Sequence, residues 1–169
     1  MTPTNPVRIE GGAGVPSDWP ARAAVPCALG PRGVLFLCVA NSARSQIAEG
    51  LARRLAPPGT KVFSAGSEPG TINPLAIRVL AEAGVDASAR HSKGLDAIPL
   101  DTIDLVVTLC AEEVCPLFPR QVRRLHWPLP DPAKATGTDE ERLAAFRAVR
   151  DELAARLPAL FSAQPPADG

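Results

Sequence analysis

The fold is decided by the stretch from Val34 to Gly50, which reads VLFLCVANSARSQIAEG. Its apolar opening, residues 34–39, is typical of a β-strand buried on both faces. The apolar residues Ile47, Leu51 and Leu55 then recur at helical spacing, so a helix is expected after the loop. A loop that joins a buried strand to a helix N-terminus directs several backbone N–H groups at one point. That point favours an anion.

The loop carries side chains that suit nucleophilic chemistry on an oxyanion. Cys38 is expected under the helix N-terminus, where the thiolate is favoured and the sulfur becomes a nucleophile. Arg44 has a planar guanidinium that can bind two oxygens of a tetrahedral oxyanion, which a lysine cannot do. Ser45 can donate a hydrogen bond to the thiolate, and Asn41 tolerates the left-handed backbone of such loops. The alternative is a buried cysteine beside a helix that happens to carry an arginine, but the strand–loop–helix context favours the anion loop.

The pattern Cys-x5-Arg-Ser after a strand resembles the low-molecular-weight tyrosine phosphatase family. The longer run LCVANSARSQIAEG is similar to its thioredoxin-coupled arsenate reductase branch, and the similarity covers the chain outside the first 32 residues and the tail. The resemblance implies arsenate as substrate, phosphate or sulfate as analogues, thioredoxin as partner and no cofactor. It also implies an oxyanion-binding loop made of Val39, Ala40, Asn41, Ser42, Ala43, Arg44 and Ser45.

Strands and helices alternate along the rest of the chain. Short apolar segments predict strands at 61–64, 105–109 and 122–126. Asn73-Pro74 and Thr138-Asp139-Glu140-Glu141 are typical helix starts. This order predicts an α/β fold, with a four-stranded parallel sheet and helices on both faces, as the resemblance also implies.

The chain is expected to contain one domain. Residues 1–32 are rich in proline and glycine and lack periodicity, so they predict an irregular arm. Residues 33–162 are the predicted catalytic domain, and residues 163–169 a flexible tail. Cys27 in the arm is interpreted as an incidental thiol.

Composition restricts the partners. Lysine plus arginine and aspartate plus glutamate each total 18, so neither a nucleic acid nor an anionic membrane is predicted to bind. No apolar run is long enough to span a bilayer, and the N-terminus lacks the pattern of a secretory signal, so we expect a cytoplasmic protein. We also expect a monomer. Four cysteines in such a chain indicate catalysis or metal binding rather than structural disulfides.

A second group of thiols follows the predicted strand at 105–109, where the sequence LCAEEVCP contains Cys110 and Cys115. Few histidines or cysteines remain to complete a zinc site, so no metal is predicted. Two buried spectator thiols are the other alternative. Reduction of arsenate takes two electrons, which one thiol cannot supply while leaving a stable product. A phosphatase needs only the loop cysteine and a proton donor, so this pair separates a reductase from a phosphatase.

The resemblance implies an order of steps for these thiols. Cys38 attacks arsenate, and Cys110 then attacks Cys38 and expels arsenite. Cys115 moves the disulfide to the Cys110–Cys115 pair, which thioredoxin reduces. The spacer between the last two cysteines is shorter than is usual in the family, so this segment must unwind before they can bond.

Asp131, in the sequence PDP, resembles the family's general acid, which gives a proton to the departing oxygen. Without the resemblance it would be interpreted as a turn residue. His126 and Trp127 just before it are interpreted as packing residues.

Several arsenate reductases of this branch hold a potassium ion beside the loop. The matching residues Asn41, Glu49 and Ser64 are retained, but Lys93 aligns with a carboxylate of the related sequences. An ammonium cannot ligate a cation, although it can occupy its place. We therefore expect Lys93 to pair with Glu49 and catalysis to be insensitive to potassium. The alternative is a solvated surface lysine.

The sequence thus predicts a thioredoxin-coupled arsenate reductase that serves arsenic detoxification. One alternative is a phosphatase that uses Cys38, Arg44 and Asp131 on phosphotyrosine or a small phosphate ester. Another is a protein that senses oxyanions or oxidants without turnover. A sensor needs no general acid, so Asp131 argues against it.

Overall fold

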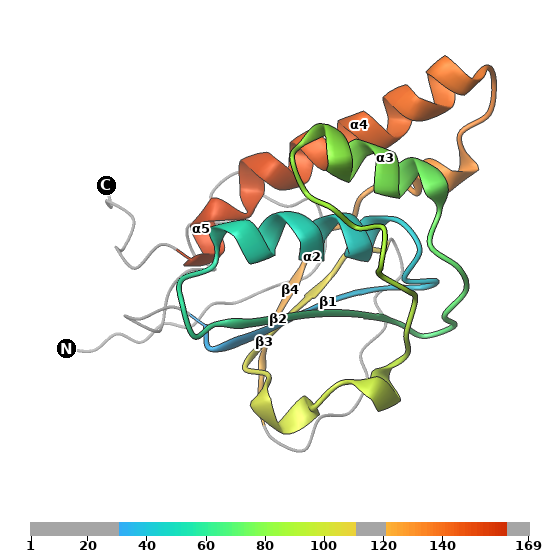
Figure 1. The fold of residues 1–169 in the computed structure, drawn as a ribbon. Helices are drawn as coiled ribbons and strands as arrows, with labels where there is room; N and C mark the ends of the chain where they lie inside the picture. Colours follow the sequence, from blue (N-terminus) through green and yellow to red (C-terminus); the bar gives the residue numbers. More distant parts are fainter. Residues whose placement is uncertain (1–30, 111–120, 162–169) are drawn as a thin grey trace.

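The computed structural model describes residues 31–110 and 121–161, which form a four-stranded sheet covered by helices (Figure 1). The strands are β1 (Gly33–Cys38), β2 (Lys61–Gly66), β3 (Leu105–Thr108) and β4 (Arg123–His126). All neighbouring strands are parallel, and their order is β2-β1-β3-β4. The predicted parallel sheet is confirmed. Every residue of β1, one of the two inner strands, is buried.

Helices cover both faces of the sheet in the described part of the chain. The α-helices α2 (Arg44–Leu55), α3 (Pro74–Glu82), α4 (Asp139–Arg156) and α5 (Pro158–Phe161) lie on one face (Figure 1). The short 3₁₀ helices η1 (Leu95–Ala97) and η2 (Leu100–Thr102) pack on the other face. A third one, η3 (Pro132–Lys134), lies between β4 and α4 in the chain.

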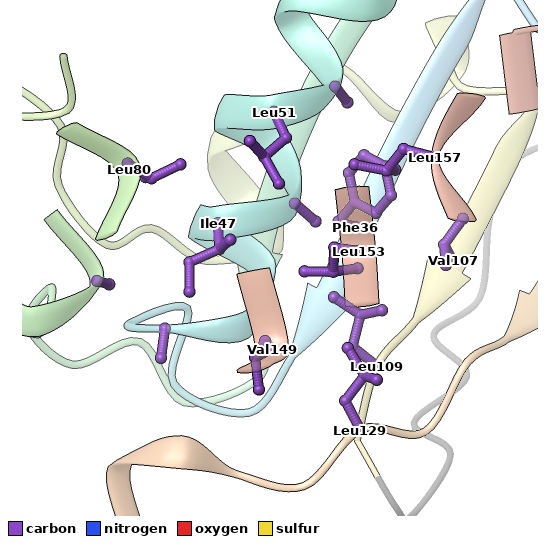
Figure 2. Close-up of a cluster of buried hydrophobic side chains, with 14 of the residues drawn as sticks. Phe36, Ile47, Leu51, Leu80, Val107, Leu109, Leu129, Val149, Leu153 and Leu157 are labelled. Carbon is purple, nitrogen blue, oxygen red and sulfur yellow. The ribbon is translucent and has the colours of Figure 1, made fainter. Parts of the chain in front are cut away.

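The larger hydrophobic core fills the space between the sheet and the α-helices (Figure 2). Phe36 and Val107 of the sheet pack in this core with Leu153 of α4. Leu35 and Val106, the preceding residues of the same strands, belong to a separate, smaller core on the opposite face. Because side chains alternate along a strand, a strand in both cores must be apolar throughout, as the sequence of β1 predicted.

The helix boundaries follow local signals. Asn73 accepts a hydrogen bond from Leu75 N at 2.8 Å and so caps α3. Thr138 and Glu141 form the predicted capping box of α4. The apolar stripe of α2 does not extend to Leu55, which is 43% exposed because the helix ends there.

The strand predicted at 61–64 extends to Gly66, because Ala65 and Gly66 pair with Leu37 and Cys38. Trp127 is fully buried in the larger core, which confirms its packing role.

An ion-pair network joins α3 to α4. Glu82 at the end of α3 accepts hydrogen bonds from Arg147 Nη2 at 2.7 Å and Arg150 Nη1 at 2.8 Å. The hydrogen bond from Arg147, with that from Arg150, lowers the pKa of Glu82 to about 2. A carboxylate with a lowered pKa stabilises the folded state at neutral pH, and this contribution is lost as the pH falls from about 4.5 towards 2.

Residues 1–30, 111–120 and 162–169 lie outside the described residues. The predicted tail, nearly all of the predicted arm and the thiols Cys27 and Cys115 therefore belong to parts that the structure does not describe. Among the described helices, none combines the length and apolar character that crossing a bilayer requires.

Candidate active site

The predicted anion loop connects β1 to α2 at the carboxyl edge of the sheet. β1 ends at Cys38, and α2 begins at Arg44. Within the loop Asn41 adopts the left-handed conformation, with φ of +50°. The N-cap residue of α2 is Ala43, which has no side chain that could bond the first N–H groups of the helix. The loop and the helix N-terminus can therefore offer main-chain N–H groups to an anion.

A hydrogen-bond network surrounds Cys38, the predicted nucleophile. The buried Cys38 Sγ lies 2.8 Å from Ser45 Oγ. Asn41 Nδ2 donates to Ser45 Oγ at 2.7 Å and to Ser64 Oγ at 2.9 Å. Because Ser45 Oγ accepts a hydrogen from Asn41, its own hydrogen can be donated to the sulfur of Cys38. A thiolate accepts such a hydrogen bond more strongly than a neutral thiol does, so the network suits a nucleophile.

The side chain and carbonyl of Asn41 connect the loop to a second segment. Its Oδ1 accepts from Gln46 Nε2 and from the backbone N of Lys93, both at 2.9 Å. Its carbonyl oxygen accepts from Ser92 Oγ at 2.8 Å. The sequence indicated Asn41 for its backbone conformation and for the cation site. The binding partners Gln46 and Ser92 were missed, because only the fold brings them to the loop.

The residues expected at the cation site converge on Glu49. Ser64 Oγ donates to Glu49 Oε1 at 2.5 Å, and the glutamate is 4% exposed. Three cations surround its carboxylate: Arg53 Nη2 at 2.7 Å from Oε2, with Arg90 Nη1 and Lys93 Nζ each at 3.5 Å from Oε1. Arg53 and Arg90 were not predicted. The protein's own cationic side chains therefore balance the negative charge of the Glu49 carboxylate.

Arg44 and Asp131 meet on the other side of the loop. Arg44 Nη1 donates to the carbonyl oxygen of Leu129 at 3.0 Å, and Arg44 Nη2 lies 3.6 Å from Asp131 Oδ2. Asp131 Oδ1 accepts from Ala133 N at 3.0 Å, so Asp131 also caps the short helix η3. These bonds orient the carboxyl group beside the guanidinium that is expected to bind the oxyanion.

A cavity of about 350 Å³ brings together many of the predicted residues, but Asn41 and Ser45 of the predicted oxyanion-binding set are not in its lining. Its lining consists of Cys38, Val39, Ala40, Ser42, Ala43, Arg44, Cys110, Leu129, Pro130, Asp131 and Lys134. Cys110 is 4% exposed and follows β3, so two parallel strands bring two thiols to one cavity. Cys115 lies outside the described residues.

Lys134 was not predicted to belong to the site. The signal was the Asp-Pro that starts η3. With three residues per turn, this helix returns the chain to the side of Asp131 three positions later, and Lys134 is in the cavity lining. Within the described residues, no cluster of three or more histidine, cysteine or acidic side chains could hold a metal ion.

Comparison with known proteins agrees with this geometry. The model of the low molecular weight phosphotyrosine protein phosphatase family matches residues 33–165, so the chain belongs to this family. An arsenate reductase of Halalkalibacterium halodurans is 47% identical over 126 residues, which cover 73% of this chain and 91% of that protein.

Solved structures of arsenate reductases are also similar. The enzyme of Archaeoglobus fulgidus is 34% identical with a TM-score of 0.63, over 76% of this chain and 98% of that one. A thioredoxin-dependent arsenate reductase of Corynebacterium glutamicum is 32% identical with a TM-score of 0.55, over 78% of this chain and 64% of that one.

Proposed function

We propose that the protein reduces arsenate to arsenite with a relay of three cysteines and that thioredoxin restores the thiols. The observation that carries this proposal is the pair Cys38 and Cys110 in the lining of one cavity. Hydrolysis of a phosphate ester needs no second thiol, whereas a two-electron reduction does. The names of the relatives at 47% identity support the same activity, and a phosphatase is not favoured.

The first half of the cycle uses the described residues. The Cys38 thiolate attacks the arsenic of arsenate, which the loop N–H groups and Arg44 hold. An As–O bond breaks, and Asp131 gives its proton to the departing oxygen, which leaves as water. The Cys110 thiolate then attacks the sulfur of Cys38. A disulfide forms, the electron pair of the S–As bond stays on arsenic, and arsenic leaves in the +3 state as arsenite.

The second half of the cycle returns Cys38 to the thiolate. Cys115 attacks the sulfur of Cys110, so that Cys38 is released and the disulfide passes to the Cys110–Cys115 pair. Thioredoxin, named for the Corynebacterium glutamicum relative, reduces this pair by thiol–disulfide exchange. Disulfide geometry requires close Cβ atoms, so the segment between these cysteines must rearrange. We therefore also propose that the protein acts in the cytoplasm, where thioredoxin keeps thiols reduced.

The proposal is tested by coupling arsenate reduction to NADPH consumption through thioredoxin and thioredoxin reductase. The wild-type protein is expected to turn over continuously. Cys115→Ser should release one arsenite per protein molecule and then slow by at least about tenfold, since the Cys38–Cys110 disulfide has no internal thiol to resolve it. Cys27→Ser, the matched control outside the relay, should behave as wild type. Continuous turnover by Cys115→Ser would show that Cys115 is a bystander.

We also propose that Lys93 replaces a bound monovalent cation. Its ammonium lies 3.5 Å from Glu49 Oε1, a carboxylate oxygen that also accepts a hydrogen bond from Ser64. The kcat/KM for arsenate should therefore differ by less than about twofold between potassium and sodium buffers of equal ionic strength. Lys93→Asp should create a dependence on potassium, which the same substitution at the exposed Lys61 should not. Strong activation of the wild-type protein by potassium would contradict the proposal.

A further inference from the structure

A second cation lines the active-site cavity besides Arg44. Lys134 ends η3, and its backbone N donates to the carbonyl oxygen of Asp131 at 3.1 Å. Its side chain is exposed, and no carboxylate in the described residues forms a salt bridge with it. Within the described residues the charge of Lys134 is thus not paired with a carboxylate, whereas that of Arg44 is shared with Asp131.

The charges in the cavity favour a small anion. When Asp131 carries the proton that a general acid delivers, Arg44 and Lys134 contribute two positive charges against the one negative charge of the Cys38 thiolate. Without Lys134 the charges of Arg44 and the thiolate would cancel. Inorganic arsenate and phosphate carry up to two negative charges near neutral pH. Opposite charges in a site that is partly shielded from water attract more strongly than they do in bulk water.

The remaining lining also fits a small ligand. It consists of short or aliphatic side chains such as Val39, Ala40 and Leu129, and none of the described lining residues is aromatic. An aryl ester would place its ring against such a lining without a flat aromatic partner. The described lining therefore favours a ligand by its charge and offers no aromatic side chain on which the ring of a substrate could stack.

We propose that Lys134 is a substrate-binding residue, which gives the site a second positive charge for a doubly charged inorganic oxyanion. This inference rests on the proposed reductase function for the identity of the substrate but not for the binding of the anion. It predicts an effect on KM rather than on kcat, because Lys134 lies at the cavity and not in the thiol relay.

Steady-state kinetics in the thioredoxin-coupled assay tests the first part. Lys134→Ala should raise KM for arsenate about 3- to 10-fold and change kcat by less than about twofold, and Lys134→Arg should restore KM. Lys61→Ala is the matched control. Lys61 starts β2 opposite Gly33, whereas Cys38 pairs with Gly66 at the far end of the same strand. An equal change in Lys61→Ala, or no change in Lys134→Ala, would overturn the inference.

A direct binding measurement separates this inference from the proposed function. Inorganic phosphate should protect Cys38 from alkylation by neutral iodoacetamide, and mass spectrometry of the tryptic peptide 33–44 reports the modified fraction. Lys134→Ala should weaken the apparent phosphate affinity about 3- to 10-fold, and added salt should weaken it less than in the wild-type protein. If arsenate is not reduced but these shifts occur, the reductase proposal fails and Lys134 remains an anion ligand. Equal affinities and equal salt dependences would refute the role of Lys134.

Discussion

Cys110→Ser is expected to lower arsenate reduction by about 10³-fold or more, in a single turnover as well as in the steady state. The serine hydroxyl cannot attack the sulfur of Cys38, so the adduct between Cys38 and arsenate has no route to arsenite. Any hydrolysis of p-nitrophenyl phosphate by the wild-type protein should change by less than about twofold, because that reaction uses only the loop and a general acid. Quenched-flow detection of arsenite and a colorimetric ester assay give the two rates.

Two further variants define the limits of this comparison. Cys38→Ser should abolish arsenite release and ester hydrolysis alike, because both begin at this sulfur. Cys27→Ser should leave both rates unchanged. If Cys110→Ser still releases one arsenite per protein molecule, another thiol attacks Cys38, and the proposed order of the relay is wrong. If the wild-type protein hydrolyses esters but does not reduce arsenate, it is a phosphatase.

The sequence predicted those features of the fold that depend on residues close together in the chain. The apolar run around Cys38 predicted a strand buried on both faces, and this is confirmed, since the strand contributes to a core on each side of the sheet. The capping residues Asn73 and Thr138 correctly predicted where α3 and α4 begin. In each case the information lies within a few residues of the feature, as strand burial and helix capping require.

Other features of the site depend on segments that are distant in the sequence. Arg90 approaches Glu49, and Ser92 bonds Asn41, only because the segment that leads into η1 returns to the loop. No periodicity or motif in that segment predicts the course that the chain takes there. The place of Lys134 in the cavity lining could be predicted only if the turn of η3 were known. The exposure of Leu55 could be predicted only if the end of α2 were known. The sequence pattern therefore predicted the loop itself, whereas the packing of other segments against the loop is visible only in the structure.

Gly66 is the clearest case of a residue whose role only the fold explains. It ends β2 beside Cys38, and its backbone N donates to the carbonyl oxygen of Lys93 at 2.9 Å. A Cβ at this position would lie 2.5 Å from the carbonyl oxygen of Val39 and 2.8 Å from the backbone N of Asn41. Both atoms belong to the main chain of the anion loop, so no flexible side chain can move aside.

Gly66→Ala is therefore expected to displace the loop. A shift of its N–H groups by about 1 Å should lower kcat/KM for arsenate by about 10²-fold, at a cost of about 1–3 kcal/mol in the free energy of unfolding. Gly70→Ala is the matched control: it lies in the same segment, but its Cβ would have only the Ala40 Cβ nearby, at 3.9 Å. Thermal melts establish that both variants fold, and coupled kinetics then compare them. Near-normal activity in Gly66→Ala would mean that the loop can move and still bind the oxyanion. It would also mean that the close approach of β2 does not fix the position of the loop.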